Sequence, residues 1–181
     1  MNSTLLPFVH LHVHSQYSTL DGQASIEGLI DKAWSDGMRA IALTDHGAMY
    51  GIKKFYNYAK QKNAPFHAEI KRLTKEIETL EGKGEAEEKV APLKKQLKAE
   101  QEKIFKPIIG CECYVARNDR FTKTDKEDGG GWHLIVLAKN LQGYKNLIKI
   151  VSKSWIEGHY YRPRIDKELL EQYREGLIIS Y

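Results

Sequence analysis

Two spacings of apolar residues alternate along most of the chain. Short aliphatic runs are typical of strands, and stretches in which apolar residues recur every three or four positions are typical of helices. The predicted strands cover residues 8–14, 39–44, 107–116, 132–138 and 177–180. The predicted helices begin after Ser25, near Ile52, at Leu141 and after Asp166. This order predicts an α/β fold in which helices connect neighbouring strands of a largely parallel sheet.

The first predicted strand carries an unusual polar face. Side chains on a strand alternate between its two sides, so the three aliphatic residues of 9–13 share one face. The other face carries His10, His12 and His14. Histidines that point into a fold need a partner, and a divalent metal is the commonest partner of clustered neutral imidazoles. A histidine face exposed on an edge strand is the alternative, but several histidines in register favour metal binding.

Three further groups of chemical interest lie on or beside later strands. Asp45 and His46 directly follow the strand 39–44, where active-site loops of parallel α/β proteins lie. Glu112 falls on the face of its strand opposite the apolar residues, so it is expected to be a ligand, a general base or an ion-pair partner. His133 interrupts an apolar strand. Alone it would be interpreted as a core histidine, and only the other candidates favour a ligand role.

Residues 63–105 depart from the alternating pattern. Apolar residues at helical spacing on both sides of the glycines at 82 and 84 predict an antiparallel helical hairpin. Its apolar stripe is narrow, as in a coiled coil, and its acidic and basic residues nearly balance. The hairpin looks inserted into the fold. It can be a docking arm for a partner or a tolerated surface elaboration, and we favour the latter because surface insertions cost little.

Composition narrows the class of protein. The 181 residues are 41% hydrophobic and 29% charged, which is ordinary for a globular chain. No apolar run is long enough to span a membrane, and no secretion signal begins the chain, so a cytoplasmic location is expected. Cys111 and Cys113 are poorly spaced to bridge each other, which agrees with a reducing compartment. The chain ends just after an aliphatic strand, and we expect it to be part of a longer protein.

The distribution of charge is more informative than its total of +4. Between Lys139 and Arg164 there are six Lys or Arg and one acidic residue, Glu157, with aromatic residues interleaved near the end. Basic and aromatic side chains together are typical of polynucleotide contacts. The candidate DNA-binding residues are Lys145, Lys149, Lys153, Arg162 and Arg164. A solvated lysine face on the helix explains the pattern equally well.

Four motifs resemble, in order and spacing, those of the PHP (polymerase and histidinol phosphatase) domain family. They are His12-Val13-His14-Ser15 with Asp21-Gly22, Thr44-Asp45-His46-Gly47, Gly110-Cys111-Glu112-Cys113-Tyr114-Val115, and Trp132-His133-Leu134. Linking segments such as 106–112 and 143–147 are similar to the branch of the family at the N-terminus of bacterial replicative DNA polymerases. The resemblance covers residues 1–181 except the hairpin.

The resemblance implies a distorted (β/α)7 barrel, of which this chain is an incomplete N-terminal portion with residues 63–105 inserted. It also implies two to three divalent metal ions, zinc or manganese. The implied ligands are His12, His14, Asp21, His46, Glu112 and His133. Further family ligands would lie beyond residue 181, and His10 is given only a neighbouring role. Asp45 is the candidate catalytic residue, because it could orient a ligand or handle a proton.

The implied activity is metal-dependent phosphoester hydrolysis, as a proofreading 3′–5′ exonuclease. Bridging metal ions lower the pKa of a bound water and neutralise phosphoryl charge. The polymerase site, with its magnesium, would lie outside this chain, and the partners would be DNA, the sliding clamp and a separate exonuclease subunit. Two alternatives are a non-catalytic, metal-stabilised replisome scaffold and a stand-alone phosphatase for a small phosphoester such as histidinol phosphate.

Overall fold

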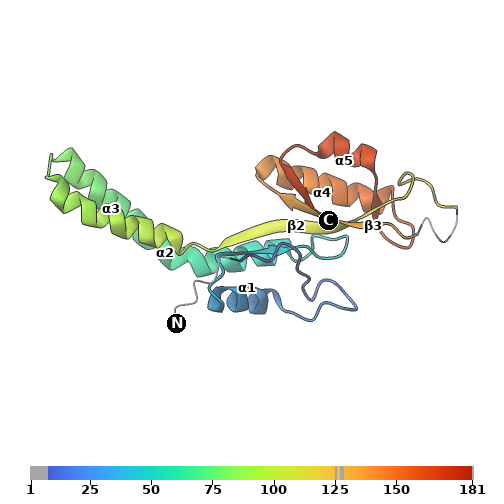
Figure 1. The fold of residues 1–181 in the computed structure, drawn as a ribbon, viewed down its shortest axis with the longest axis horizontal. Coiled ribbons are helices and arrows are strands. Elements are labelled where there is room, and N and C mark those ends of the chain that lie inside the picture. Colours follow the sequence, from blue (N-terminus) through green and yellow to red (C-terminus); the bar gives the residue numbers. More distant parts are fainter. Residues whose placement is uncertain (1–7, 125, 127–128, 181) are drawn as a thin grey trace.

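The structure is a computed structural model that describes residues 8–124, 126 and 129–180. These residues form a mixed α/β fold with one sheet and a long helical arm (Figure 1). The strands are β1 (Ala40–Leu43), β2 (Lys106–Val115), β3 (Trp132–Ala138), β4 (Arg164–Ile165) and β5 (Leu177–Ser180). The helices are α1 (Ile26–Ser35), α2 (Ile52–Gly82), α3 (Glu87–Glu102), α4 (Leu141–Ile156) and α5 (Lys167–Tyr173).

The sheet is mixed rather than largely parallel. Its order is β1-β2-β3-β5, and β4 pairs with the end of β2. β1 and β4 run parallel to β2, whereas β3 is antiparallel to both β2 and β5. The expectation of a parallel sheet is therefore wrong for β3, which pairs with β2 in the antiparallel direction. The described residues between β2 and β3 contain no helix, and a parallel neighbour is usually reached through a crossover helix. Within the described residues the sheet does not close, so a (β/α)7 barrel is not confirmed.

The segment 8–14 is not the strand that its alternation predicts. It runs beside β1 with two backbone hydrogen bonds, from Ala42 N to His10 O and from Thr44 N to Val13 O, both 2.9 Å. A bend at residues 11–12 interrupts the alternation. Leu11 is consequently exposed, and His10 lines the same hollow as Val13. The bend separates His10 from His12 and His14, whose side chains lie next to each other.

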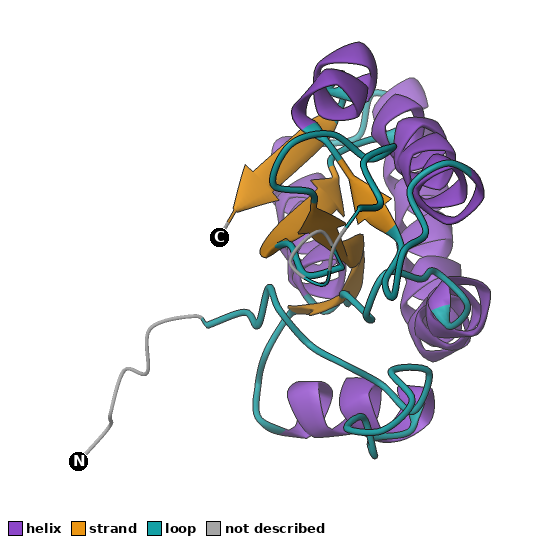
Figure 2. Ribbon diagram, turned by 90° about the vertical axis from the view of Figure 1, so that its right-hand side faces the viewer, coloured by secondary structure: helices purple, strands orange, loops and turns teal. Residues whose placement is uncertain are grey.

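Two apolar cores hold the helices on the sheet. One joins α1, β1 and the first turns of α2, and the other joins β2 and β3 to α4, β4 and α5. Cys111 and Cys113 belong to the second core as free, buried thiols, so the predicted apolar face of β2 is confirmed. Figure 2 shows most helices gathered on one side of the sheet. The opposite side carries only a small apolar cluster, and Glu112 points to that side.

α2 and α3 pack antiparallel and form the arm in Figure 1. The separate short helix predicted near Ile52 is continuous with the first helix of the hairpin, because α2 runs for 31 residues and tolerates Pro65 within it. Asn63 and Phe105 join the base of the arm. The Asn63 side chain donates to Phe105 O at 2.8 Å, and its oxygen accepts from Phe105 N at 2.9 Å. That the hairpin is an insertion in the family fold stays a prediction.

Asn63→Ala is expected to destabilise the chain by about 2–3 kcal/mol, because it leaves a buried backbone N–H and C=O of Phe105 without partners. Urea denaturation measures the change in the free energy of unfolding. Asn57→Ala, at an exposed position of the same helix, is the matched control and should cost little. Because Ala has a higher helix propensity than Asn, helix propensity cannot account for a loss in the Asn63 variant. An equal change in both variants would show that the Phe105 contact does not contribute to stability.

Candidate metal centre

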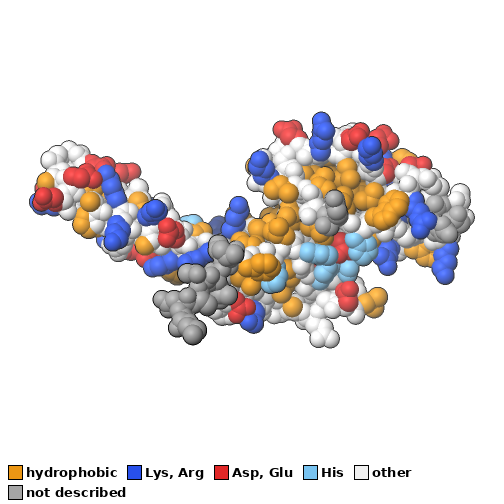
Figure 3. Space-filling view, in the orientation of Figure 1, with side chains coloured by type: hydrophobic (Ala, Val, Ile, Leu, Met, Phe, Trp, Pro, Cys, Tyr) orange, Lys and Arg blue, Asp and Glu red, His pale blue; other side chains and the backbone are white. Residues whose placement is uncertain are grey.

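The site is centred on Glu112 of β2, whose side chain is 1% exposed. Its Oε2 lies 2.7 Å from His12 Nε2 and 3.1 Å from His14 Nε2. Its Oε1 lies 3.0 Å from His46 Nδ1 and 2.9 Å from His133 Nδ1. Each carboxylate oxygen thus faces two imidazole nitrogens. We call these five residues the Glu112 cluster, and Figure 3 shows the histidines gathered in one patch beside exposed apolar side chains.

The strand pairings bring these distant residues together. His46 follows β1 and forms an isolated parallel bridge with Glu112, since β1 lies parallel to β2. His133 is at the N-terminal end of β3 and is paired with Tyr114, two residues beyond Glu112. An antiparallel strand begins where its neighbour ends. His133 therefore reaches the cluster only because β3 is antiparallel, and not through the rule for parallel strands.

The donor atoms suit a divalent ion. His12 Nε2 and His14 Nε2 are 2.9 Å apart, and both contact the same Glu112 oxygen, so these three atoms form a triangle. N–H donation cannot satisfy all three contacts at once, because each nitrogen carries at most one proton. Ligand atoms that share a tetrahedral ion at about 2.0–2.1 Å lie roughly 3.3 Å apart. The triangle needs only a small opening to accept one.

Electrostatics favour the metal-binding forms of Glu112 and His14. Burial on its own raises the pKa of the Glu112 carboxyl, but the hydrogen bond with His12 and the nearby His46 and His133 outweigh burial, so the pKa is lowered. Burial and the neighbouring His46 lower the pKa of His14. Glu112 is therefore favoured as the anion and His14 as the neutral imidazole, which are the forms that bind metals.

Asp21 joins the site through His46 rather than through Glu112. Asp21 Oδ2 lies 2.9 Å from His46 Nε2, and its side chain is exposed. Burial on its own lowers the pKa of His46. Asp21 and Glu112 raise this pKa by more than burial lowers it, so the net shift is upward. Sequence reasoning missed Tyr114, whose hydroxyl lies 2.9 Å from His46 Nδ1. Its place on the same strand face as Glu112 was the available signal.

Asp45 lies behind the cluster and not in it. Its buried carboxylate accepts hydrogen bonds from Ser15 N at 2.6 Å and from Ser18 Oγ at 2.7 Å. Ser18 Oγ also lies 3.0 Å from His14 Nδ1. Because Asp45 only accepts, the Ser18 hydroxyl donates to it and accepts from His14 Nδ1–H, which directs the His14 Nε2 lone pair toward Glu112. These contacts favour an orienting role for Asp45 over the proton-handling role considered from sequence.

The structure separates the five candidate DNA-binding residues. Lys145, Lys149 and Lys153 lie on α4, which packs against the cysteine side of β2, opposite Glu112. Lys153 is paired with Glu157, and the ammonium of Lys149 lies over the Tyr173 ring. Only one of the five residues, Arg162, reaches the Glu112 cluster, with its Nη1 at 3.4 Å from His133 Nε2.

Arg164 does not fit the predicted DNA-binding role. Its side chain is 1% exposed, and its guanidinium donates to Gly158 O at 3.0 Å and to Arg120 O at 3.1 Å. A guanidinium committed to backbone carbonyls inside the fold cannot contact a phosphate without breaking those bonds. The prediction for Arg164 is therefore corrected: it is a structural residue whose hydrogen bonds join β4 to the loop after β2.

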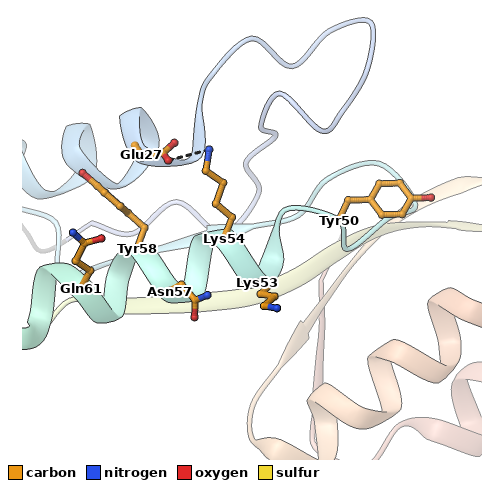
Figure 4. Close-up of a pocket in the computed structure, with 7 residues that line it drawn as sticks. All are labelled: Glu27, Tyr50, Lys53, Lys54, Asn57, Tyr58 and Gln61. Atoms are coloured by element: carbon orange, nitrogen blue, oxygen red, sulfur yellow. Dashed lines mark ion pairs between the residues drawn. The ribbon is translucent and has the colours of Figure 1, made fainter.

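An open hollow of about 500 Å³ lies between α1 and α2 (Figure 4). Its lining includes Lys53, Lys54 and Tyr58, and Lys54 is paired with Glu27 at 2.9 Å. No residue of the Glu112 cluster lines it. The hollow therefore has no part in the chemistry considered below.

This chain is similar to several curated proteins. Among curated proteins, the DNA polymerase III subunit alpha of Borreliella burgdorferi is 43% identical over 174 residues, which are 96% of this chain and 12% of that protein. The corresponding subunit of Treponema pallidum is 41% identical over 96% of this chain and 11% of its own length. That of Aquifex aeolicus is 40% identical over 94% of this chain and 12% of its own length.

The chain thus spans about 12% of the length of these relatives. No described helix is long and apolar enough to cross a membrane. The profile of the PHP domain matches residues 10–180, which include every residue of the Glu112 cluster. The chain therefore belongs to the PHP domain family.

Proposed function

We propose that this chain is the N-terminal PHP portion of a DNA polymerase III alpha subunit and that the Glu112 cluster is a metal-dependent phosphoesterase site. The proposed reaction is 3′–5′ exonucleolytic cleavage of DNA, which would serve proofreading. The observation that carries the proposal is a buried carboxylate whose two oxygens each face two imidazole nitrogens. A purely structural carboxylate is more often satisfied by backbone groups or by ordered water.

The donor atoms of His12, His14 and Glu112 lie close enough to share one ion, and we infer a second position beside it. His12, His14 and Glu112 Oε2 would hold one ion, while His46, His133 and Glu112 Oε1 would hold another, with Asp21 beside His46. Mixed imidazole and carboxylate ligands suit zinc or manganese. When bound, such ions supply a hydroxide nucleophile near neutral pH and neutralise charge on a phosphoryl group. A third ion would need ligands outside these residues.

The rest of the proposal concerns the whole protein. We infer that the longer protein polymerises DNA at a separate magnesium site and acts in the cytoplasm with the sliding clamp and an exonuclease subunit. The names of the relatives support replication as the setting. The arm of α2 and α3, which projects from the fold in Figure 1, is a surface elaboration in this proposal.

Replacing His12 or His46 by Ala in the full-length protein is expected to lower hydrolysis of single-stranded DNA at least a hundredfold, because each removes a metal ligand. Mass spectrometry of the purified protein measures metal content, and 3′-labelled DNA measures hydrolysis. His67→Ala, at an exposed position of α2, is the control and should change neither.

The same measurements separate the alternatives. Bound metal without hydrolysis of any phosphoester would favour a non-catalytic scaffold. Hydrolysis restricted to a small phosphomonoester would favour a phosphatase. A wild-type protein without bound metal would contradict the proposal.

Ser18→Ala tests how the cluster is held in place. Loss of the hydroxyl between Asp45 and His14 is expected to weaken metal binding by about 10–100-fold, as for other partners of metal ligands. Competition with a chelator measures the affinity. Ser35→Ala removes an exposed hydroxyl of α1 and should leave the affinity unchanged. Equal affinity in the Ser18 variant would mean that the histidine needs no such support.

A further inference from the structure

A tight turn after α4 aims Arg162 at the Glu112 cluster. Tyr160 N donates to Arg162 O at 3.0 Å, and Tyr161 at the tip has φ +58°. A bulky residue in the left-handed region is uncommon, and such strained residues gather at functional sites. The reversal sends the Arg162 side chain back toward β2 and β3.

The next residue anchors this turn to the loop that carries His46. Pro163 is buried, and its Cγ would lie 2.5 Å from a Cβ placed on Gly47, so only glycine fits there. Gly47 also has φ +55°, and its N–H donates to Glu112 O at 2.8 Å. The backbone next to Arg162 is therefore fixed against Gly47. The backbone of Gly47 also helps to position His46 and Glu112.

The guanidinium is held but not neutralised. Its centre lies 4.8 Å from the centroid of the Tyr114 ring, and Nη1 lies 3.4 Å from His133 Nε2. Among the residues that the structure describes, no carboxylate pairs with Arg162. Arg120 differs, because it is buried and bonds Asp166 and Glu157. An exposed cation fixed by an aromatic face has lost part of its conformational freedom before a ligand arrives.

We propose that Arg162 binds a phosphate oxygen of the phosphoester held at the Glu112 cluster. The inference rests on the proposed function and adds a residue that recognises the substrate. A guanidinium beside bound divalent cations is stable only when an anion lies between them, and its planar fork matches two phosphate oxygens. Positioned there, Arg162 also opposes the negative charge that develops on the phosphoryl group during cleavage.

The test compares full-length wild type with Arg162→Gln and Arg162→Lys, all loaded with the same metal. Calorimetric titration with inorganic phosphate is expected to show about tenfold weaker binding for Arg162→Gln, with Arg162→Lys between the two. For single-stranded DNA, kcat/KM should fall by about a hundredfold in Arg162→Gln, while metal content stays unchanged. Arg174→Gln removes an exposed positive charge at the end of α5 and is the matched control.

Each outcome decides the inference. Unchanged phosphate affinity and kcat/KM in Arg162→Gln would overturn it while leaving the proposed hydrolysis intact. Weaker phosphate binding in Arg162→Gln, with no hydrolysis by any of the proteins, would support the role of Arg162 and contradict the proposed function. Loss of metal in Arg162→Gln, or wild type that binds no phosphate, would overturn the inference, because the effect would then not come from a phosphate contact.

Discussion

Glu112→Gln is expected to reduce phosphoester hydrolysis by on the order of a thousandfold, equivalent to about 4 kcal/mol of transition-state stabilisation. The substitution keeps the size of the side chain but removes its charge. Because one buried carboxylate contacts all four histidines, its neutralisation weakens both proposed metal positions together. Metal content measured by mass spectrometry should fall with activity, whereas loss of a single histidine is expected to affect one position more than the other.

Glu168→Gln is the matched control, since it removes a carboxylate from an exposed position of α5. Circular dichroism should show the same helix content in both variants. A Glu112→Gln protein that retains wild-type metal content would contradict the central role of this carboxylate. Activity lost without loss of metal would instead assign Glu112 a role in the reaction itself.

Asp166→Ala is expected to destabilise the chain by about 3–5 kcal/mol, as when one partner of a buried ion pair is removed. Asp166 is buried and accepts from Arg120 Nη1 at 2.9 Å and from Arg120 N at 3.0 Å. The same carboxylate caps α5 by accepting from Leu169 N at 2.9 Å. Its loss leaves the buried Arg120 guanidinium with only Glu157 and removes a helix cap as well.

Urea denaturation followed by circular dichroism measures this loss. Asp36→Ala is the comparison, because Asp36 pairs with Lys32 at the exposed C-terminal end of α1, where such pairs contribute little. Asp166→Asn retains a side-chain oxygen for the cap and should recover part of the stability. If both alanine variants unfold at the same urea concentration as the wild type, the Asp166 contacts do not contribute as argued.

Local physics accounts for what could be predicted from the sequence. Ser25 and Asp166 cap α1 and α5 through their own side chains, so those helix starts follow from nearby residues. The period-two pattern of β2 places Glu112 opposite Cys111 and Cys113 whatever strand pairs with it. The motifs that resemble the PHP family likewise predicted that the four histidines and Glu112 belong to one site.

Other features depended on contacts between distant residues. Residues 8–14 alternate like a strand but lie beside β1 as an irregular, bent segment. They make only two backbone–backbone hydrogen bonds to residues 40–44, from Ala42 N and from Thr44 N. His133 reaches Glu112 because β3 pairs antiparallel with β2, and a periodic pattern does not specify the direction of its partner.

Arg162 and Arg164, both candidate DNA-binding residues, show the same limit most clearly. The sequence by itself determined that Arg162 and Arg164 lie two residues apart, on either side of Pro163, in a basic and aromatic stretch. Only the tertiary structure decided that Arg164 is buried against backbone carbonyls while Arg162 lies over Tyr114 beside the cluster. The physical reason is that the charge and spacing of a residue are local properties, whereas its burial depends on which distant segments fold against it.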